Sequence, residues 1–177
     1  LNPDTVRMIL YTSGTTGRPK GVLHSHNSIH ALIRQIGEHW LVTDGDRFLV
    51  PSPIAHIGGS IYAFECPLLL GTLAAAHRAG TQLPDLKVFI CGGASVPPSL
   101  IRRATDYLEK AAVSRVYGST EVPVTTVGSL GDVDHAADTD GLAGIADIQL
   151  TAGEICARGP QMLVGYLHTD AETASCD

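Results

Sequence analysis

The spacing of apolar residues changes along the chain, and each spacing predicts a different element. Between residues 25 and 39 the apolar side chains recur at the interval of an amphipathic helix: Ile29, Leu32, Ile33 and Ile36. Ser25 or Asn27 is suited to cap this helix. An apolar segment at 61–70 predicts a buried helix. A stretch opened by two prolines, from residue 97 to about residue 111, predicts another.

Strands are predicted where short runs are rich in β-branched and apolar residues. These runs are 5–11, 22–24, 46–50, 86–91 and 114–117, and two further pieces lie within 145–158. The pieces within 145–158 flank Ala152 and Gly153, which predicts a hairpin. The alternation of strands and helices predicts an α/β fold with a largely parallel sheet. The glycine- and aspartate-rich stretch 126–144 predicts an exposed loop region.

Composition narrows the class of protein. The chain has 177 residues, of which 44% are apolar and 17% charged, as in an ordinary globular domain with a core. The net charge of −6 and the lack of a basic run exclude a nucleic-acid-binding surface. No apolar run approaches the roughly 18–20 residues that span a bilayer, and no signal peptide opens the sequence. We therefore expect a cytoplasmic protein without a transmembrane segment.

Neither the cysteines nor the histidines have the spacing of a metal site. The four cysteines are widely separated and form no C-x-x-C pair, which favours reduced thiols over a zinc knuckle. His24, His26 and His30 cluster, and the last two would share a helix face. No glutamate lies between them as in H-E-x-x-H, and no third ligand is evident, so a metal site is not favoured.

One stretch, residues 12–21, has no hydrophobic period and reads Thr-Ser-Gly-Thr-Thr-Gly-Arg-Pro-Lys-Gly. Its glycines let backbone N–H groups approach an anion closely, its hydroxyl groups donate further hydrogen bonds, and Lys20 brings a positive charge. This composition favours a loop that binds a polyphosphate. Its spacing differs from the G-x-x-x-x-G-K-[ST] loop of P-loop nucleotide hydrolases. A flexible surface turn is the alternative interpretation.

With its neighbours Tyr11 and Val22, this stretch resembles the phosphate-loop signature of the adenylate-forming (ANL) superfamily. Within that superfamily the chain resembles AMP-dependent acyl-CoA synthetases of the fatty-acid–CoA ligase type. Residues 51–56 (Pro-Ser-Pro-Ile-Ala-His) resemble the family's Pro-rich motif, and residues 117–121 (Tyr-Gly-Ser-Thr-Glu) resemble its Tyr-Gly-x-Thr-Glu motif. Residues 153–160, followed by Gly-Tyr at 165–166, resemble its Gly-Glu-[apolar]-x-[apolar]-[Arg/Lys]-Gly segment. The four matches follow the family's order and span nearly the whole chain.

The resemblance implies a two-step reaction. A carboxylate attacks the α-phosphate of ATP, giving an acyl-adenylate and pyrophosphate, and a thiol, usually that of coenzyme A, then displaces AMP. Carried over by motif, Lys20 would hold the β- and γ-phosphates, Thr120 would bond to the α-phosphate, and Glu121 would bind Mg²⁺. The implied nucleotide-binding residues are Thr12, Ser13, Gly14, Thr15, Thr16, Gly17, Lys20, Gly92, Gly93, Ala94, Tyr117, Gly118, Ser119 and Thr120.

Some of the implied roles have ordinary structural alternatives. Tyr117 would flank the adenine but could be a core tyrosine, and Glu121 could be a solvated glutamate at a strand end. The small residues at 92–94 follow a predicted buried strand, where open α/β sheets bind ligands, but they could form a plain tight turn. His56 would orient the carboxylate or gate the entry of coenzyme A, and its alternative is a structural histidine.

The lack of an acidic residue near the Pro-rich motif limits which carboxylic acid can be the substrate. Relatives that activate amino acids carry an aspartate after an aromatic residue in the Pro-rich region, where it pairs with the substrate ammonium. Residues 55–60 hold no acid here, and a buried unpaired ammonium would be costly. We therefore expect an uncharged acyl tail, either fatty, alicyclic or aromatic. The small side chains of Gly58, Gly59 and Ser119 leave room for a bulky group.

The chain also departs from the family's pattern. His56 and Gly92 are only 36 residues apart, which indicates an omitted segment near 72–73. Residues 141–144 read Gly-Leu-Ala-Gly where Gly-Arg-Pro-Gly is usual. The ribose-binding aspartate and the C-terminal domain with its catalytic lysine are not found. We expect an incomplete large N-terminal domain of mostly parallel sheets flanked by helices. Residues 1–140 would form a nucleotide- and acyl-binding core, and 141–177 a β-rich subdomain truncated before the lid domain.

Three functions remain open on the sequence. The first is an acyl-CoA synthetase that uses ATP, Mg²⁺, coenzyme A and a small carboxylic acid, and the resemblance leaves room for a homodimer. The second is an adenylation domain that loads a carrier protein. The third is an inactive nucleotide-binding module, which the truncation favours and which the intact Lys20, Thr120 and Glu121 oppose.

Overall fold

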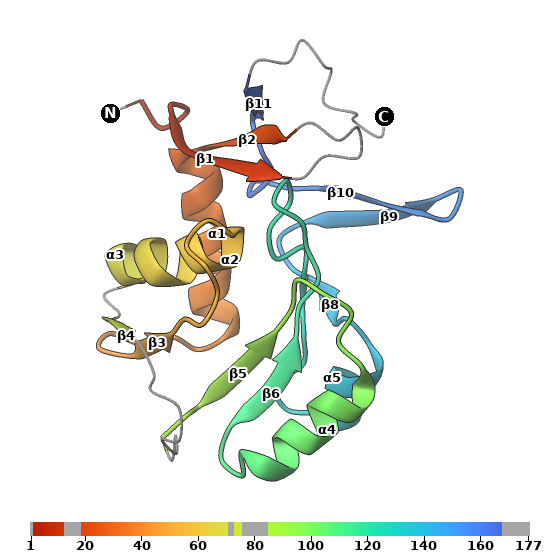
Figure 1. Ribbon diagram of the computed structural model, residues 1–177. Coiled ribbons are helices and arrows are strands. Elements are labelled where there is room, and N and C mark those ends of the chain that lie inside the picture. Colours follow the sequence, from red (N-terminus) through yellow and green to blue (C-terminus); the bar gives the residue numbers. More distant parts are fainter. Residues whose placement is uncertain (1, 13–18, 71–72, 76–84, 168–177) are drawn as a thin grey trace.

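The computed structural model describes residues 2–12, 19–70, 73–75 and 85–167, which fold into an α/β arrangement (Figure 1). The strands are β1 (Val6–Thr12), β2 (Lys20–Ser25), β3 (Arg47–Leu49), β4 (Leu73–Ala75), β5 (Val88–Cys91), β6 (Ala112–Arg115), β7 (Thr126–Val127), β8 (Leu142–Ala143), β9 (Asp147–Thr151), β10 (Glu154–Arg158) and β11 (Gly165–Leu167). The helical elements are α1 (His26–His39), α2 (Ile57–Ser60), the π-helical turn η1 (Ile61–Glu65), α3 (Cys66–Leu70), α4 (Pro98–Tyr107) and α5 (Val133–Asp138).

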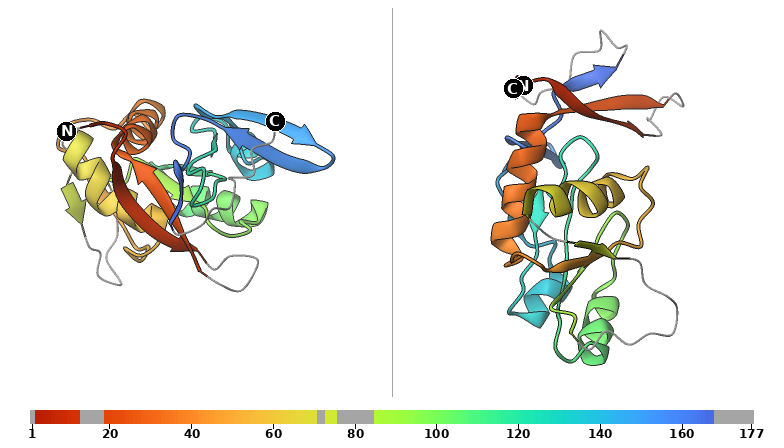
Figure 2. Two further views of the ribbon diagram at one scale, coloured as in Figure 1. Left: turned by 90° about the horizontal axis from the view of Figure 1, so that it is seen from above. Right: turned by 90° about the vertical axis from the view of Figure 1, so that its left-hand side faces the viewer.

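A three-stranded antiparallel sheet, in the order β1-β2-β11, lies at one end of the molecule (Figures 1 and 2). The chain passes from β2 into α1 without a linker, because Ser25 ends the strand and caps the helix. The Ser25 side chain accepts from the Ser28 backbone N–H, and the Ser28 side chain accepts from that of Ser25. This reciprocal cap confirms Ser25 as the helix start. Strand β2 is longer than the predicted 22–24 and begins at Lys20.

Two parallel strand pairs lie below this sheet, β3 with β4 and β5 with β6 (Figure 1). The parallel expectation therefore holds for these pairs, whereas the sheet that carries β2 and the pairs β7–β8 and β9–β10 are antiparallel. Strand β6 spans Ala112–Arg115 rather than the predicted 114–117. The reason is that β5 ends at Cys91, whose carbonyl accepts the last bond of the pair from Val116 at 2.9 Å. Helix α4 ends four residues before the expected 111, because Leu108 leaves helical backbone angles.

The helix predicted at 61–70 starts earlier, at Ile57, and runs through α2, η1 and α3. His56 caps its start, with the imidazole Nδ1 accepting from the Gly58 backbone N–H at 3.2 Å. The π-helical turn contains Glu65, which is buried and forms an ion pair with Arg7 of β1 at 2.8 Å. This pair joins the helical stretch to the antiparallel sheet.

The main core lies between α1 and the elements packed around it. Its members are apolar side chains on the predicted inner face of α1 and their partners: Leu10, Ile29, Leu32, Ile33, Ile36, Trp40, Ile57, Ile61, Cys66, Val124 and Val127. The helical period of the sequence therefore identified the buried face of α1. A second, smaller cluster of Ile101, Val113, Ala136 and Ala137 joins α4, β6 and α5.

The prediction of an exposed loop at 126–144 is wrong. This stretch holds β7, α5 and β8, and Ala136 and Ala137 are buried. Asp132 caps α5 by accepting from the His135 backbone N–H at 2.9 Å, so an aspartate that suggested a loop in fact begins a helix. The hairpin predicted within 145–158 is confirmed as β9 and β10, with Ala152 and Gly153 at positive φ in its turn.

The cysteines only partly follow the expectation of reduced thiols. Cys66 and Cys91 are free, and burial raises the pKa of the Cys66 thiol to about 12, which keeps it protonated and unreactive. Cys156 is disulfide-bonded, so the expectation is wrong for this residue.

Candidate functional site

Lys20 and Glu121 both contact the side chain of Tyr166, the first at its ring and the second at its hydroxyl group. Lys20 begins β2, and its Nζ lies 5.4 Å from the centroid of the Tyr166 ring. The Tyr166 hydroxyl donates to a carboxylate oxygen of Glu121 at 3.3 Å. Three of the four motifs that the sequence singled out therefore meet at one place. Lys20 and Glu121 are both partly exposed, so their charges are accessible to a ligand.

A buried histidine ties the motif at 117–121 to the same sheet. His24 of β2 is fully buried, and its Nε2 bonds to the backbone oxygen of Thr120 at 2.8 Å. Because that oxygen can only accept, His24 Nε2 carries a proton. Burial lowers the pKa of His24, while the bond to Thr120 and the charge of Glu121 act in the opposite direction. Sequence analysis considered His24 as a metal ligand, and the structure gives it this positioning role instead.

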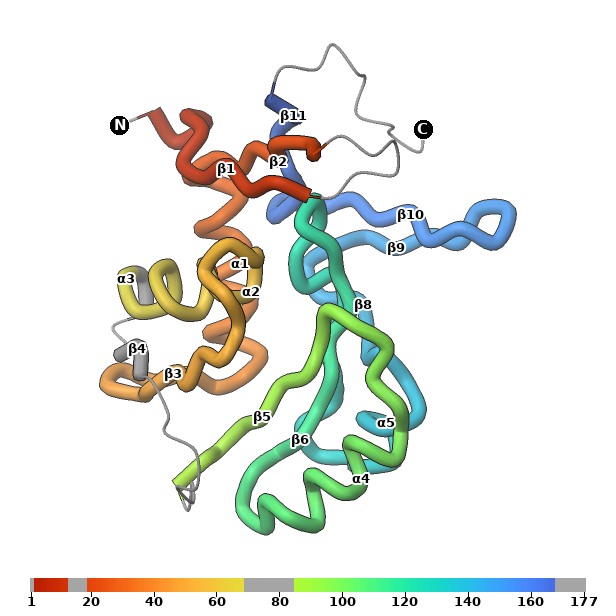
Figure 3. Tube along the Cα trace, viewed as in Figure 1, coloured from red at the N-terminus to blue at the C-terminus, as the bar shows by residue number. Residues whose placement is uncertain are grey.

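The segment after β6 carries the motif from the lower strands up to the antiparallel sheet, as the tube in Figure 3 shows. A turn then folds it back: Ser119 and Val122 exchange two hydrogen bonds, at 3.1 and 3.2 Å. Gly118 lies inside this turn, where an added Cβ would sit 2.6 Å from the Val124 nitrogen, so only glycine fits. The turn leaves Thr120 and Glu121 at its tip, next to β2 and β11.

The second group of candidate residues lies at the carboxyl ends of β5 and β6. Gly92 directly follows β5 and lies close to Val116. An added Cβ on Gly92 would be 2.9 Å from the Val116 carbonyl oxygen. Gly93 has φ +80°, and a Cβ there would meet His56 Cε1 at 3.7 Å. Tyr117, with 43% of its surface exposed, follows β6. This is the edge of a parallel sheet at which open α/β folds bind ligands.

The predicted site residues therefore fall into two groups that the structure assembles. Lys20, Thr120 and Glu121 gather beside Tyr166. Gly92, Gly93 and His56 gather beside the exposed Ala94. Residues 117–119 link the groups, since Tyr117 belongs to the second and Glu121 to the first. Thr12 ends β1 opposite Lys20. The loop residues Ser13, Gly14, Thr15, Thr16 and Gly17 lie outside the described residues.

The chemistry of Glu121 fits a magnesium ion that also binds phosphate. One carboxylate oxygen accepts from Tyr166, and no basic side chain among the described residues forms an ion pair with this carboxylate. Within the described ranges no group of three acidic, histidine or cysteine side chains gathers to hold a metal alone. Mg²⁺ commonly takes one or two protein carboxylates and completes its shell with phosphate oxygens and water.

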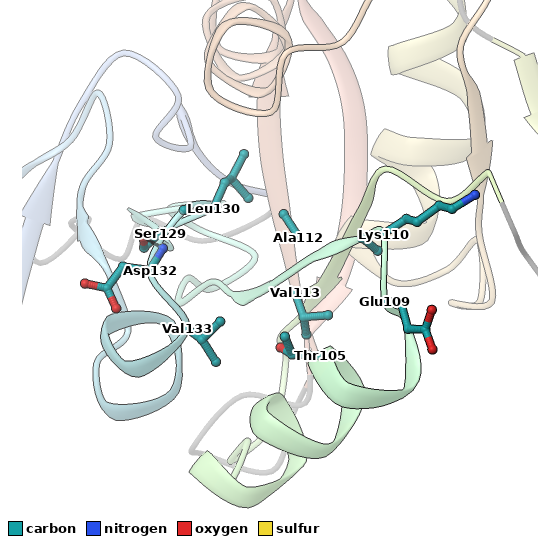
Figure 4. Close-up of a pocket in the computed structure, with 11 residues that line it drawn as sticks. Thr105, Glu109, Lys110, Ala112, Val113, Ser129, Leu130, Asp132 and Val133 are labelled. Carbon is teal, nitrogen blue, oxygen red and sulfur yellow. Dashed lines mark hydrogen bonds between the residues drawn. The ribbon is translucent and has the colours of Figure 1, made fainter.

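Two cavities of about 310 Å³ each lie elsewhere in the described part of the chain. The first lies at the amino end of β6, between the end of α4 and the segment before α5 (Figure 4). Its lining includes Glu109, Lys110 and Asp132, and none of the predicted site residues. The second lies between β3 and β5 and is lined by Trp40, Phe48 and Tyr62, among others. Neither cavity is the place where the motifs meet.

Sequence reasoning assigned no role to the residues that hold the site together. Tyr166 stood within a quoted motif, so its presence was visible, but its contacts depend on β11 pairing with β2. Gln35 is a buried polar residue on α1 whose Nε2 donates to the Val124 carbonyl at 3.0 Å and whose Oε1 accepts from Ile145. A glutamine on the apolar face of the predicted helix was the available signal.

The chain matches one family model and is similar in sequence to known proteins. The family model described as AMP-binding enzyme matches residues 1–75 and residues 72–167. The chain is 29% identical over 212 residues to a 3-[(3aS,4S,7aS)-7a-methyl-1,5-dioxo-octahydro-1H-inden-4-yl]propanoyl:CoA ligase of Rhodococcus jostii, covering 98% of this chain and 41% of the relative. It is 27% identical over 219 residues to the medium-chain fatty-acid–CoA ligase of Escherichia coli, covering 97% of this chain and 38% of the relative. The chain thus spans about two fifths of the length of these relatives.

A solved structure gives the same fold. The N-terminal domain of FACL13 from Mycobacterium tuberculosis matches with a TM-score of 0.76 at 23% identity, covering 91% of this chain and 52% of that one. The α/β arrangement is therefore that of an N-terminal domain of this kind, of which the chain holds a part. Within the described residues no helix has the length and apolarity needed to cross a membrane.

Proposed function

The chain belongs to the AMP-binding enzyme family, and from this premise we propose that it activates a carboxylic acid with ATP and passes the acyl group to coenzyme A. In the first step a carboxylate oxygen attacks the α-phosphorus of ATP, the bond to the β-phosphate oxygen breaks, and pyrophosphate leaves. In the second step the sulfur of coenzyme A attacks the acyl carbonyl carbon, its proton is lost, and AMP leaves.

The observation that carries the proposal is the meeting of Lys20 and Glu121 beside Tyr166. Transfer at phosphorus needs positive charge against the phosphates and a fixed approach of the attacking oxygen, and little covalent chemistry from the protein. A lysine supplies one such charge, and a carboxylate can recruit a second through a metal ion. The two residues come from segments about 100 positions apart in the sequence, and the fold brings them to one place.

This placement supports a proposed role for each of the residues. Lys20 and Thr12 would bind the β- and γ-phosphates from the paired ends of β1 and β2, together with the loop residues between them. Thr120 would bond to the α-phosphate through its hydroxyl, since its backbone oxygen already accepts from His24. Tyr117 and the small residues at 92–94 would flank the adenine, at the carboxyl edge of β5 and β6.

Glu121 would hold Mg²⁺ through the carboxylate oxygen that does not accept from Tyr166. When bound, this ion supplies charge neutralisation on the phosphate oxygens. The protein's own contribution is to fix the carboxylate: the backbone oxygen of Glu121 accepts from Leu163, and its side chain from Tyr166.

We propose that His56 acts on the reacting carboxylate or on the incoming thiol. Its Nδ1 accepts from the Gly58 backbone N–H, so the neutral ring carries its proton on Nε2. An added Cβ on Gly93 would lie 3.8 Å from this Nε2, and the side chain is otherwise exposed. A donor at this place would orient a substrate carboxylate or the incoming thiol at the mouth of the second group of residues.

The substrate class proposed is an acid with an uncharged tail. No acidic residue is present at 55–60 to pair with an ammonium group. The nearby Glu65 is buried and already paired with Arg7, so it does not serve that role. The relatives named above act on a fused-ring propanoyl acid and on medium-chain fatty acids. We accordingly place alicyclic and medium-chain fatty acids first among candidate substrates.

We also propose that relatives carry an additional segment near residues 72–73. The two parts of the family match overlap at 72–75, and the alignment with the Rhodococcus relative extends over 212 positions, more than the 177 residues of this chain. The cavity between β3 and β5 is lined by β3 and by residues 85–90, and we propose it as the place where such a segment would pack. Residues 1–140 would then form a nucleotide- and acyl-binding core, and residues 141–177 a β-rich subdomain.

A screen of carboxylates tests the proposal. The protein is incubated with Mg²⁺, ATP and coenzyme A, and AMP release is measured for fatty acids of several lengths and for alicyclic, aromatic and dicarboxylic acids. We expect release that depends on both the acid and coenzyme A, and that is strongest for an uncharged tail. Tight ATP binding without AMP release for any acid would contradict the proposal, and release with a carrier-protein thiol alone would replace coenzyme A as acceptor.

A further inference from the structure

Tyr166 is the one described side chain that contacts both charged groups of the proposed site. We propose that Tyr166 is a positioning residue that holds the phosphate-binding Lys20 and the metal-binding Glu121 at a fixed separation and orientation. The proposal rests on the proposed function, because it assigns Tyr166 a part in binding magnesium and ATP. It gives the ring and the hydroxyl group of the tyrosine separate tasks.

Tyr166 makes one contact with its ring and another with its hydroxyl group. The ring lies beneath the Lys20 ammonium, 5.4 Å from Nζ to the centroid, where the electron-rich face of the ring attracts the cation. The hydroxyl donates to Glu121 Oε1 at 3.3 Å. Lys20 and Glu121 form no direct ion pair among the described contacts, although they have opposite charges. Each of them instead contacts a different part of Tyr166.

The main chain around Tyr166 explains why this side chain reaches both groups. The Leu163 backbone N–H donates to the Glu121 carbonyl, and the Val164 N–H donates to the Leu23 carbonyl, both at 2.8 Å. Strand β11 then pairs with β2, placing Tyr166 opposite Val22. The segment is thus fixed to the motif turn and to β2 immediately before the tyrosine. The strand that presents Lys20 and the turn that presents Glu121 are linked through it.

The last glycine of the phosphate motif makes this pairing possible. Gly21 lies opposite Leu167, and an added Cβ on Gly21 would stand only 2.9 Å from the Leu167 Cβ. Any larger residue at position 21 would push β11 away from β2 and carry Tyr166 with it. The glycine next to Lys20 therefore has a task in this chain that does not involve the phosphates directly.

A phenol suits this position better than a charged donor. An arginine or lysine bonded to Glu121 would neutralise the carboxylate and compete with Mg²⁺ for it. A neutral hydroxyl orients one oxygen and leaves the negative charge for the metal ion. Burial and the charge of Glu121 both raise the pKa of Tyr166, so the hydroxyl keeps its proton and stays a donor at neutral pH.

Two substitutions separate the two tasks. Tyr166→Phe removes the hydroxyl and keeps the ring over Lys20. We expect the Mg²⁺ concentration for half-maximal activity to rise about three- to tenfold, the range for losing one ordinary hydrogen bond, with an unchanged KM for ATP. Tyr166→Leu removes both contacts. It should add a rise of about two- to fivefold in the KM for ATP, the range for a partly exposed cation–π contact.

The control is Tyr107→Phe, which removes the same hydroxyl from a tyrosine that is 80% exposed at the end of α4. It should leave both parameters unchanged. If Tyr166→Phe has wild-type Mg²⁺ dependence while it remains folded, the proposal for Tyr166 is overturned and the proposed function stands. If the wild-type protein shows no Mg²⁺-dependent ATP binding by calorimetry, the proposed function fails, and the positioning proposal fails with it.

A measurement that needs no activity tests the contact itself. Ultraviolet titration of the tyrosines in wild type, corrected with Tyr166→Phe, isolates the ionisation of Tyr166. Glu121→Gln removes the negative charge beside the hydroxyl and should lower the pKa of Tyr166. A pKa that does not change in Glu121→Gln would show that the two groups are not in contact, and would overturn the proposal.

Discussion

Strands β2 and β9 are both strands that the sequence pattern predicted, but they have opposite environments. In β2, Val22 and His24 are fully buried, and the strand pairs on both sides, with β1 and β11. In β9 all five residues are exposed, Leu150 at 72%, and its described partner is β10 alone. Figure 1 shows the β9–β10 hairpin projecting from the side of the molecule.

The difference shows where this fold can hold charges in place. Strand β2 continues into α1, which carries the main core, and so Lys20 is attached to the best-packed part of the molecule. The hairpin exposes the apolar side chains of Ile148, Leu150 and Ile155, and no candidate site residue lies on it. A strand signal alone therefore identifies neither the buried nor the functional strand. The helix packed against the strand makes that distinction.

The largest effect expected on the β2 side of the comparison is from Glu121→Ala. Removing the proposed metal-binding carboxylate should lower Mg²⁺-dependent AMP release at least about 100-fold, because metal-assisted neutralisation of the phosphates is lost. A matched substitution on the hairpin, Glu154→Ala, should leave turnover near wild type. Release of AMP and the thermal midpoint are measured for both. Unchanged turnover in Glu121→Ala would contradict the assigned role.

Matched leucine substitutions compare how much the core beside β2 and the hairpin contribute to the free energy of unfolding. Leu32→Ala truncates a fully buried side chain of α1 and should lower the free energy of unfolding by about 2–5 kcal/mol. Leu150→Ala makes the same chemical change on β9, where the side chain is 72% exposed, and should change stability by no more than about 0.5 kcal/mol. Urea unfolding of the two variants measures this. Equal losses would indicate that the hairpin is buried in solution.

The buried His24 should make the β2 region sensitive to acid. Its pKa in the folded chain lies below its ordinary 6.5, so the unfolded chain binds the proton more readily. Stability is therefore complete above pH 6.5 and falls as the pH decreases below that value. We expect His24→Gln to lose less stability than wild type between pH 7.5 and pH 5. His30→Gln, at an exposed position of the adjoining helix α1, should lose as much as wild type.

The smallest effect is expected at an exposed ion pair that resembles β9 in its environment. Lys87 and Asp46 are 2.6 Å apart at the rim of the cavity between β3 and β5, and the hydrogen bond from Lys87 lowers the pKa of Asp46 to about 2. Because the pair is solvent-exposed and screened, Asp46→Asn should cost less than about 1 kcal/mol. Urea unfolding at low and high salt measures it. A larger loss of stability would indicate that this ion pair is shielded from solvent, as the β2 region is.

The sequence predicted those parts of the fold that depend on neighbouring residues. The apolar period and Ser25 identified α1 and its cap, and Ala152 with Gly153 identified the hairpin turn. The resemblance to adenylate-forming enzymes identified which residues would gather at a site. Each of these signals is contained in a window of fewer than about 20 residues, and so it can be read without knowing the fold.

Contacts between distant segments could not be predicted in this way. The antiparallel pairing of β11 with β2 joins residues about 145 positions apart, and it brings Tyr166 to Lys20. The loop prediction for residues 126–144 was wrong for a related reason. The glycines and aspartates of this stretch suit a loop when taken alone, but Asp132 caps α5 and Ala137 packs in the second core cluster. Burial by a neighbouring helix decided the outcome there.

The direct join of β2 to α1 has a consequence for ligand affinity. Ser25 is the last residue of the strand and the cap of the helix, so the segment from Lys20 to His39 contains no hinge. The bond from His24 to Thr120 attaches the turn that carries Glu121 to this same unit. A nucleotide would therefore meet a lysine and a glutamate whose backbones are already ordered. Little conformational entropy would be lost there on binding, so more of the contact energy would appear as affinity.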